Sequence, residues 1–102
     1  RHQFVETLIA IAQEEIDQDV TLHTAAERLY VNPSYLSRLF KQEMGQTFSA
    51  YVLEQKMEKA KAALSDGAKV YDAARMVGYR DVSYFTKVFR KYWGVTPGGM
   101  KQ

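Results

Sequence analysis

The feature that most constrains this chain is an internal repeat with a period of 49 residues. Without a gap, residues 34–41 match residues 83–90 in chemical type at eight consecutive positions. The match extends to three further pairs: Tyr30 with Tyr79, Gly45 with Gly94, and Thr47 with Thr96. A self-match at a fixed period indicates that one supersecondary unit has been used twice. Whatever this chain folds into must therefore contain two similar units.

The repeated segment has the spacing of an amphipathic helix. Its apolar residues recur at i, i+3 and i+4, which places them on one stripe of an α-helix. The stripe consists of Leu36, Leu39 and Phe40 in the first copy and of Phe85, Val88 and Phe89 in the second. The opposite face is small and polar at its start and basic towards its end. That face consists of Ser34, Ser37, Arg38 and Lys41, and then of Ser83, Thr86, Lys87 and Arg90.

Each copy of this helix follows a shorter amphipathic helix after a tight turn. We expect the short helices at residues 21–30 and 70–77, where apolar residues again have helical spacing. The repeated helices begin at good N-caps and end at glycines that suit a left-handed C-terminal residue. These residues are Asn32, followed by Pro33, and Asp81 at the starts, and Gly45 and Gly94 at the ends. Two helices joined in this way, the second with a polar and basic outer face, form the helix-turn-helix pattern.

The remaining segments complete an all-α fold with about six to seven helices. An amphipathic helix is expected over residues 3–18, and Thr47 caps a longer linker helix over residues 47–64. We therefore predict one domain of 102 residues, divided into a first helix-turn-helix half (1–46), the linker helix and a second half (65–102). At most a short helical turn is expected after Pro97. Because the first residue is Arg rather than Met, we expect a fragment of a longer protein.

The linker helix has a length that suits DNA. Eighteen helical residues span roughly 27 Å at 1.5 Å per residue. Successive major grooves on one face of B-DNA lie roughly 34 Å apart. We therefore expect the two helix-turn-helix halves to reach two successive major grooves.

Charge is unevenly distributed along the chain, although the net charge is only +2. Residues 1–34 hold two basic and six acidic side chains, for a net charge of −4. Residues 35–102 hold the other twelve basic and six acidic side chains, for a net charge of +6. The later, positive part of the chain is the part that would meet a polyanion such as nucleic acid.

Enzymatic and metal-binding functions find no support in the sequence. The chain has no cysteine, its two histidines lie far apart, and no glycine-rich phosphate loop is present. We expect no catalytic residue, no metal ligand and no cofactor. No apolar run reaches transmembrane length, so we expect no membrane contact. Six aromatic residues are expected to pack in the core rather than to stack on single strands, namely Tyr35, Phe40, Tyr84, Phe89, Tyr92 and Trp93.

Both units, and the way they are joined, resemble the DNA-binding domain of the AraC/XylS family of bacterial transcription regulators. The resemblance covers residues from about 20 to 97 and is most specific in the second unit, with Val77-Gly78-Tyr79, Ser83-Tyr84-Phe85, Phe89-Arg90-Lys91 and Gly94-Val95-Thr96-Pro97. The first unit is also close to the family pattern. The chain departs from that pattern at Lys56, where the family usually has Arg, at Val82, where a small polar residue or proline is common, and in the tail from Gly98.

The resemblance implies a cytoplasmic bacterial regulator that binds double-stranded promoter DNA. It also implies activation through RNA polymerase, under the control of a sensory or effector domain outside these residues. Carried over to this chain, base edges would be read by Ser34, Ser37, Arg38, Val82, Ser83, Thr86 and Lys87. Phosphates would be contacted by Lys41, Lys56, Arg90 and Lys91. The chemistry of Arg38 agrees independently, because a guanidinium can donate two hydrogen bonds to guanine.

Interpretations other than DNA binding are also possible at the level of sequence. A helix-turn-helix pair can be a plain packing unit, and a basic helix face can simply be solvated. The repeat argues against both, because packing alone would not require the exposed face to recur in kind. The chain could also be a helical protein-interaction module whose basic faces bind an acidic partner. Such a module would show no preference among duplex sequences.

Overall fold

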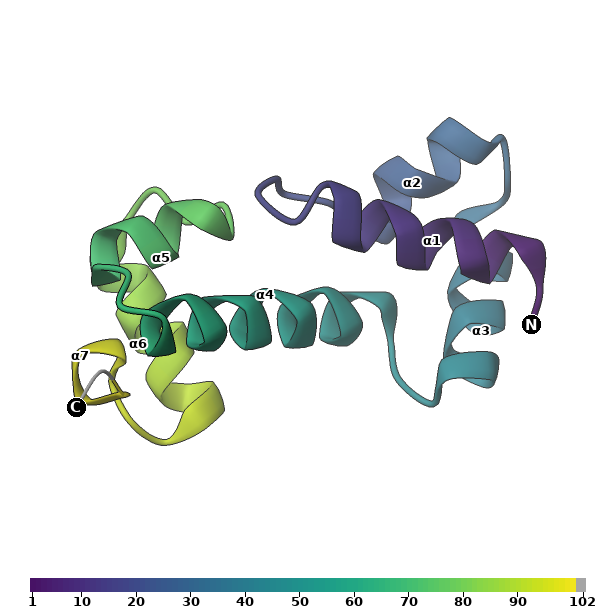
Figure 1. Ribbon diagram of the computed structural model, residues 1–102. Coiled ribbons are helices and arrows are strands. Elements are labelled where there is room, and N and C mark those ends of the chain that lie inside the picture. The colour runs from purple at the N-terminus through teal and green to yellow at the C-terminus, as the bar shows by residue number, and fades with distance from the viewer. Residues whose placement is uncertain (101–102) are drawn as a thin grey trace. The chain divides into compact units, whose positions relative to one another are not determined.

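The structure is a computed structural model that describes residues 1–100. Within that range the chain forms seven helices and no strand, which confirms the predicted all-α fold (Figure 1). The helices are α1 (Gln3–Glu14), α2 (Leu22–Leu29), α3 (Pro33–Met44), α4 (Phe48–Ser65), α5 (Val70–Met76), α6 (Val82–Trp93) and α7 (Pro97–Met100). The chain divides into two compact units, with unit 1 ending at Gln55 and unit 2 starting at Lys56. The division falls inside α4.

Unit 1 gathers α1, α2, α3 and the first part of α4 around one hydrophobic core. Leu36 and Phe40, from the predicted stripe of α3, are fully buried. The Phe40 ring meets the Phe48 ring edge-on, with centroids 5.4 Å apart, an arrangement that aromatic pairs favour. Two alanines, Ala25 and Ala26, form the buried side of α2. The other core residues are Val5, Leu8, Ile11, Ala12, Tyr51 and Val52.

Unit 2 is organised around the aromatic stripe of α6. Phe85 and Phe89 are fully buried, and the Phe89 ring lies 6.5 Å from the ring of Trp93. The indole N–H of Trp93 donates to the backbone carbonyl of Met57 at 3.2 Å, which satisfies the one polar group of that side chain. The other buried apolar residues are Met57, Ala60, Ala63, Leu64, Ala73, Ala74, Val77 and Pro97. The recurring apolar stripe therefore builds a separate core in each unit.

The ends of the helices follow the predicted caps, with one exception. The side chains of Asn32, Thr47 and Asp81 each accept a hydrogen bond from the backbone N–H three residues later. Gly45 and Gly94 both have positive φ at the helix C-termini, at 75° and 82°. These positions confirm the boundaries expected for the repeated helices.

The first helix is shorter than predicted. Residues 3–18 were expected to be helical, but α1 ends at Glu14. Glu15 leaves helical geometry at φ −111°, and its N–H closes the helix on the carbonyl of Ile11 at 2.9 Å. The chain must turn there to return as α2, so connectivity overrides the apolar spacing.

The gapless alignment of the two copies is correct for the repeated helices, α3 and α6, which we call the recognition helices. It is wrong for the turns that precede them. In unit 1 the N–H of Val31 closes α2 on the carbonyl of Ala26, and in unit 2 the N–H of Tyr79 closes α5 on the carbonyl of Ala74. Tyr79 is thus equivalent to Val31, a shift of 48 residues rather than 49. The turn of unit 2 contains one additional residue. Tyr30 is consequently equivalent to Gly78, and both have positive φ.

A single helical turn follows Pro97, as expected. The hydroxyl of Thr96 accepts a hydrogen bond from the N–H of Gly99 at 3.1 Å and so caps α7. Lys101 and Gln102, which belong to the predicted second half, lie outside the described residues.

Candidate DNA-binding surface

The outer face of α3 is exposed from its first turn to its last. Asn32 caps the helix through its side-chain oxygen, which accepts from the N–H of Tyr35 at 3.1 Å, and Pro33 occupies the first helical position. All four residues predicted for the polar and basic face are exposed, namely Ser34, Ser37, Arg38 and Lys41. The predicted base-reading residues of unit 1 therefore share one accessible helix face.

The outer face of α6 has the same layout with different side chains. Asp81 replaces Asn32 as the cap and accepts from the N–H of Tyr84 at 3.1 Å. The predicted contacts are exposed at Ser83, Lys87, Arg90 and Lys91, whereas Val82 and Thr86 are half-buried. Val82 still offers part of its side chain at the start of the helix, where an apolar contact with a thymine methyl would be made.

The basic side chains on both faces are not paired with other side chains in the described part of the chain. None of Arg38, Lys41, Lys87, Arg90 and Lys91 forms an ion pair or hydrogen bond with another side chain among residues 1–100. By contrast, Arg28 on α2 is paired with Glu15 at 2.9 Å. Unpaired exposed cations are the groups that can replace the counterions of a nucleic-acid backbone.

The two recognition helices differ at their N-termini. In unit 1 the N–H of Ser34 is the one first-turn amide that no capping bond uses, because Pro33 has none and Tyr35 and Leu36 donate to Asn32. In unit 2 the amides of Val82 and Ser83 both lack an acceptor within residues 1–100, while those of Tyr84 and Phe85 donate to Asp81. That second helix start also carries the negative charge of Asp81. A helix N-terminus attracts phosphate, but a carboxylate at the same place repels it.

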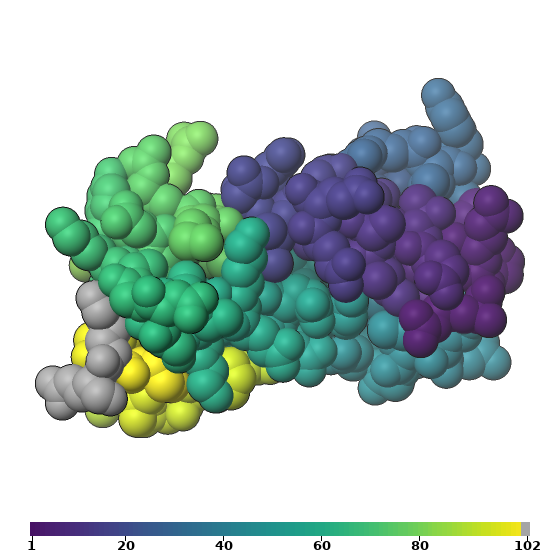
Figure 2. Space-filling model, in the orientation of Figure 1, coloured from purple at the N-terminus to yellow at the C-terminus, as the bar shows by residue number. Residues whose placement is uncertain are grey.

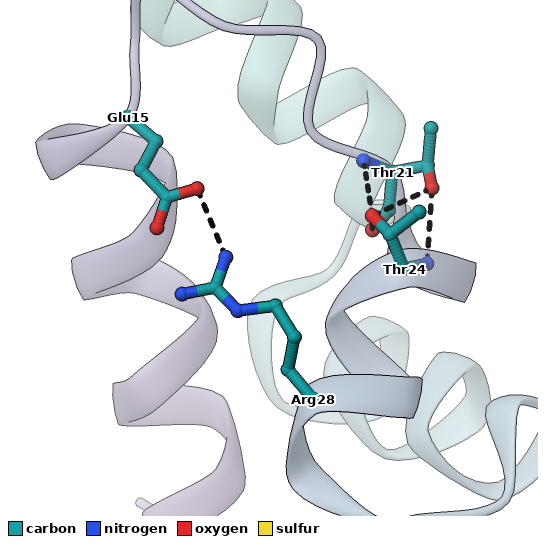
Figure 3. Close-up of polar contacts among 4 residues, drawn as sticks. All are labelled: Glu15, Thr21, Thr24 and Arg28. Atoms are coloured by element: carbon teal, nitrogen blue, oxygen red, sulfur yellow. Dashed lines mark hydrogen bonds and ion pairs between the residues drawn. The ribbon is translucent and has the colours of Figure 1, made fainter.

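The helix before α3 is fixed at both of its ends (Figure 3). At the start of α2, Thr21 and Thr24 form a capping box, with the N–H of Thr24 donating to the Thr21 hydroxyl at 3.1 Å. At the end of α2, Arg28 reaches the carboxylate of Glu15 beyond the end of α1. The Arg28 guanidinium lowers the pKa of Glu15, first by this hydrogen bond and then by its charge. These contacts hold α2 in place against the rest of unit 1.

Lys56 lies inside unit 2, although a phosphate contact was expected there. Its side chain is 9% exposed, and its ammonium donates to the backbone carbonyl of Val77 at 2.9 Å, at the C-terminus of α5. A buried ammonium that is already bound to a carbonyl does not suit a phosphate contact. Lys56 is therefore left out of the DNA-contacting set. Its burial depends on tertiary packing, which helix spacing alone does not reveal.

Several tyrosines are exposed, although packing roles were expected for most aromatic residues. Phe40 and Phe89 are buried as predicted, and Trp93 is half-buried. Tyr35, Tyr84 and Tyr92 are exposed, so the prediction was wrong for these three. Tyr35 and Tyr84 stand at equivalent positions in the first turns of α3 and α6. The repeat places both on the polar side of their helices, which is the signal that could have identified them.

Other kinds of site are not formed by the described part of the chain. Within residues 1–100, no group of three or more histidine, cysteine, aspartate or glutamate side chains comes together in a way that could hold a metal ion. No helix in the same range combines the length and apolar character needed to cross a membrane.

The exposed face of α1, which is dark purple in Figure 2, is acidic and includes Glu6 and Glu14.

Comparisons with known proteins agree with this geometry. Residues 25–102 match the family described as a helix-turn-helix domain. The chain is 38% identical over 98 residues to YtdP, an uncharacterised HTH-type transcriptional regulator of Bacillus subtilis, covering 95% of this chain and 13% of that protein. The chain spans about a third or less of the curated relatives that it matches.

Solved structures of other proteins share the fold. The C-terminal domain of AraT, a response regulator from Geobacillus stearothermophilus, superposes with a TM-score of 0.92 at 36% identity, covering 98% of this chain and 84% of that chain. The DNA-binding domain of AdpA, solved in complex with a target DNA, gives a TM-score of 0.86 and covers 98% of this chain and 91% of that chain. Its 21% identity shows a likeness of fold alone.

Proposed function

This chain belongs to the AraC/XylS family of bacterial transcription regulators, and we propose that it binds double-stranded promoter DNA sequence-specifically. Each helix-turn-helix unit would place its recognition helix, α3 or α6, in a major groove. The observation that carries the proposal is the exposed polar and basic face on both helices, whose basic side chains form no ion pair with another side chain among residues 1–100. Packing of the core does not require such a face, whereas binding to DNA requires polar and basic groups on the surface that enters the groove.

The two faces suit direct reading of base edges. Arg38 would donate a bidentate pair to guanine, while Ser34 and Ser37 allow close approach with weaker selectivity. In unit 2 the corresponding residues are Ser83, Thr86 and Lys87, with Val82 placed for a thymine methyl. Lys41, Arg90 and Lys91 lie a turn further along their helices and are assigned to phosphates.

The linker helix supports binding to two successive grooves. α4 contains 18 residues, so it spans roughly 27 Å, compared with roughly 34 Å between successive major grooves. We treat residues 1–102 as one DNA-binding domain of a longer regulator. We further propose that this regulator works in the cytoplasm and activates transcription by contacting RNA polymerase, under the control of a sensory domain outside these residues.

Selection of bound duplexes from a random pool tests the proposal. The salt concentration must be held at a stated value, because counterion release alone changes affinity by orders of magnitude. Two enriched blocks about 10 base pairs apart are expected if both helices read bases. A single block would restrict base reading to one unit. If no sequence were enriched, the proposal would fail in favour of an acidic protein partner.

A further inference from the structure

Tyr30, in the turn between α2 and α3, is a residue type that neither the turn nor the core of unit 1 requires. Its backbone is left-handed, with φ 57° and ψ 42°, and it is the one non-glycine residue with positive φ among residues 1–100. This conformation is unfavourable for a residue with a Cβ atom. Its side chain is 95% exposed, so the ring contributes almost nothing to the core. The equivalent residue of unit 2 is Gly78, which adopts the same conformation freely.

The exposed hydroxyl of Tyr30 has no partner among the described residues, whereas the surrounding backbone is satisfied. The N–H of Tyr30 donates to the carbonyl of Glu27 at 3.2 Å, and the N–H of Val31 donates to that of Ala26 at 3.0 Å. The turn therefore holds its shape through main-chain bonds and the α2 cap. Glycine would adopt this conformation without the steric cost, so neither the turn nor the core explains a tyrosine at this position.

We propose that Tyr30 is a DNA-backbone contact whose hydroxyl donates a hydrogen bond to a phosphate oxygen. The inference rests on the proposed function, because it takes α3 as the helix that enters the groove. Tyr30 lies two residues before Asn32, the N-cap of that helix. A recognition helix contacts bases through its N-terminal residues, so the chain just before its N-cap passes the phosphates that border the groove. A long side chain projecting freely from that turn can reach them.

The chemistry of tyrosine separates this contact from those made by the basic residues. The phenol donates one neutral hydrogen bond and brings no charge, so it releases no counterion. A contact to phosphate carries no sequence information. Tyr30 should therefore add affinity equally on all duplexes without adding to the salt dependence.

The test compares Tyr30→Phe and Tyr30→Gly with the unchanged chain on a selected duplex and on an unrelated duplex, over a range of salt concentrations. Tyr30→Phe is expected to weaken binding by about three- to tenfold on both duplexes with the same salt slope. Tyr30→Gly is expected to weaken binding at least as much while raising the melting temperature of the free protein by a few degrees. Lys41→Ala is the control for a charged contact and should reduce the salt slope by about 1.

The outcomes separate this inference from the proposed function. If both Tyr30 variants bind as tightly as the unchanged chain while Lys41→Ala weakens binding, Tyr30 makes no contact with phosphate. The proposal that the chain binds DNA then stands. If binding falls on the selected duplex alone, Tyr30 reads a base and the phosphate assignment is overturned. If only Tyr30→Gly weakens binding, the ring rather than the hydroxyl makes the contact, which also overturns it. A chain that prefers no duplex and does not respond to Lys41→Ala would overturn both proposals.

Discussion

Units 1 and 2 present similar outer faces on scaffolds that are stabilised by different contacts. In unit 1 the helix before the recognition helix is held by a threonine capping box and by the ion pair between Arg28 and Glu15. In unit 2 the corresponding helix has no side-chain cap, and the buried ammonium of Lys56 binds its last turn instead. The exposed faces recur in kind although their supports do not. The repeat therefore preserves the exposed face and the buried stripe of the repeated helix, but not the contacts that hold the helix before it.

The comparison also separates the two units by the chemistry of their surfaces. Unit 1 combines Arg38 with the neutral cap Asn32, whereas unit 2 combines Lys87 with the charged cap Asp81. Arginine offers a planar fork for guanine, and lysine offers a point charge. On this basis unit 1 should supply the sharper base discrimination.

The largest effects should come from the two cores. Phe40 and Phe89 occupy equivalent positions in α3 and α6 and are both fully buried. Replacing either by alanine should reduce the free energy of unfolding by about 3–5 kcal/mol, since each leaves a cavity. Amide hydrogen exchange should show protection lost mainly in unit 1 for Phe40→Ala and mainly in unit 2 for Phe89→Ala. Equal loss throughout both variants would mean that the units are not separate folding blocks.

Arg38→Ala should weaken binding to a selected duplex by about 1–3 kcal/mol and relax the preference at one base position. Lys87→Ala is the matched change in unit 2 and should have a smaller effect on discrimination. Affinities measured by titration on the selected duplex and on single-base variants of it would separate the two. Equal losses on selected and random DNA for Arg38→Ala would contradict its assignment as a base contact.

Lys56→Met tests how the scaffold of unit 2 is held. The substitution keeps much of the apolar stem but leaves the carbonyl of Val77 without the ammonium donor, which should cost about 1–3 kcal/mol of unfolding free energy. Chemical denaturation would measure the loss. Because the side chain is buried, the salt slope of DNA binding should stay as in the unchanged chain. A salt slope reduced by about 1 would instead support the phosphate contact that the sequence predicts for Lys56.

Asp81→Asn would give unit 2 the neutral kind of cap that unit 1 has. Asparagine and aspartate cap helices about equally well, so the stability should change little. Removing a negative charge from the start of α6 should raise affinity for every duplex by about two- to fivefold at low salt. Titrations on selected and unrelated duplexes would measure this gain. A fall confined to the selected duplex would instead identify Asp81 as an acceptor for a cytosine amino group.

The smallest effect is expected for the ion pair between Arg28 on α2 and Glu15. Arg28 lowers the pKa of Glu15 in the folded chain. The pair therefore stabilises the fold above the carboxyl pKa of the unfolded chain, about 4.3, and this contribution is lost as the pH falls through the lower folded value. Glu15→Gln should accordingly lower the melting temperature slightly at pH 7 and not at all in strong acid. A difference that persists in strong acid would assign the effect to packing.

Local signals in the sequence identified most of the fold. Apolar spacing located the helices, and Asn32, Asp81, Gly45 and Gly94 marked the ends of the recognition helices. The sequence could not reveal the additional residue in the second turn, because a gapless match of similar residues aligned Tyr30 with Tyr79. It also missed the left-handed conformation of Tyr30, since such a conformation is set by the turn and not by the preference of tyrosine.

The candidate site was predictable to a similar degree. The exposed face of each recognition helix follows directly from helical periodicity, because its residues lie opposite a buried stripe. The burial of Lys56 does not, since it depends on where the C-terminus of α5 meets α4 in unit 2. The exposure of Tyr84 was not predicted either, because an aromatic side chain favours burial whereas the position of Tyr84 lies on the polar face of α6.

We propose that both units read DNA from one side of the duplex. The direct test takes a selected duplex and inserts about 5 base pairs, half a helical turn, between its two blocks. Affinity should fall to that of a duplex carrying one block, because the second groove then faces away. An insertion of a full turn, compared in the same titration, reports how far the linker helix can reach. Undiminished affinity after the half-turn insertion would contradict the claim.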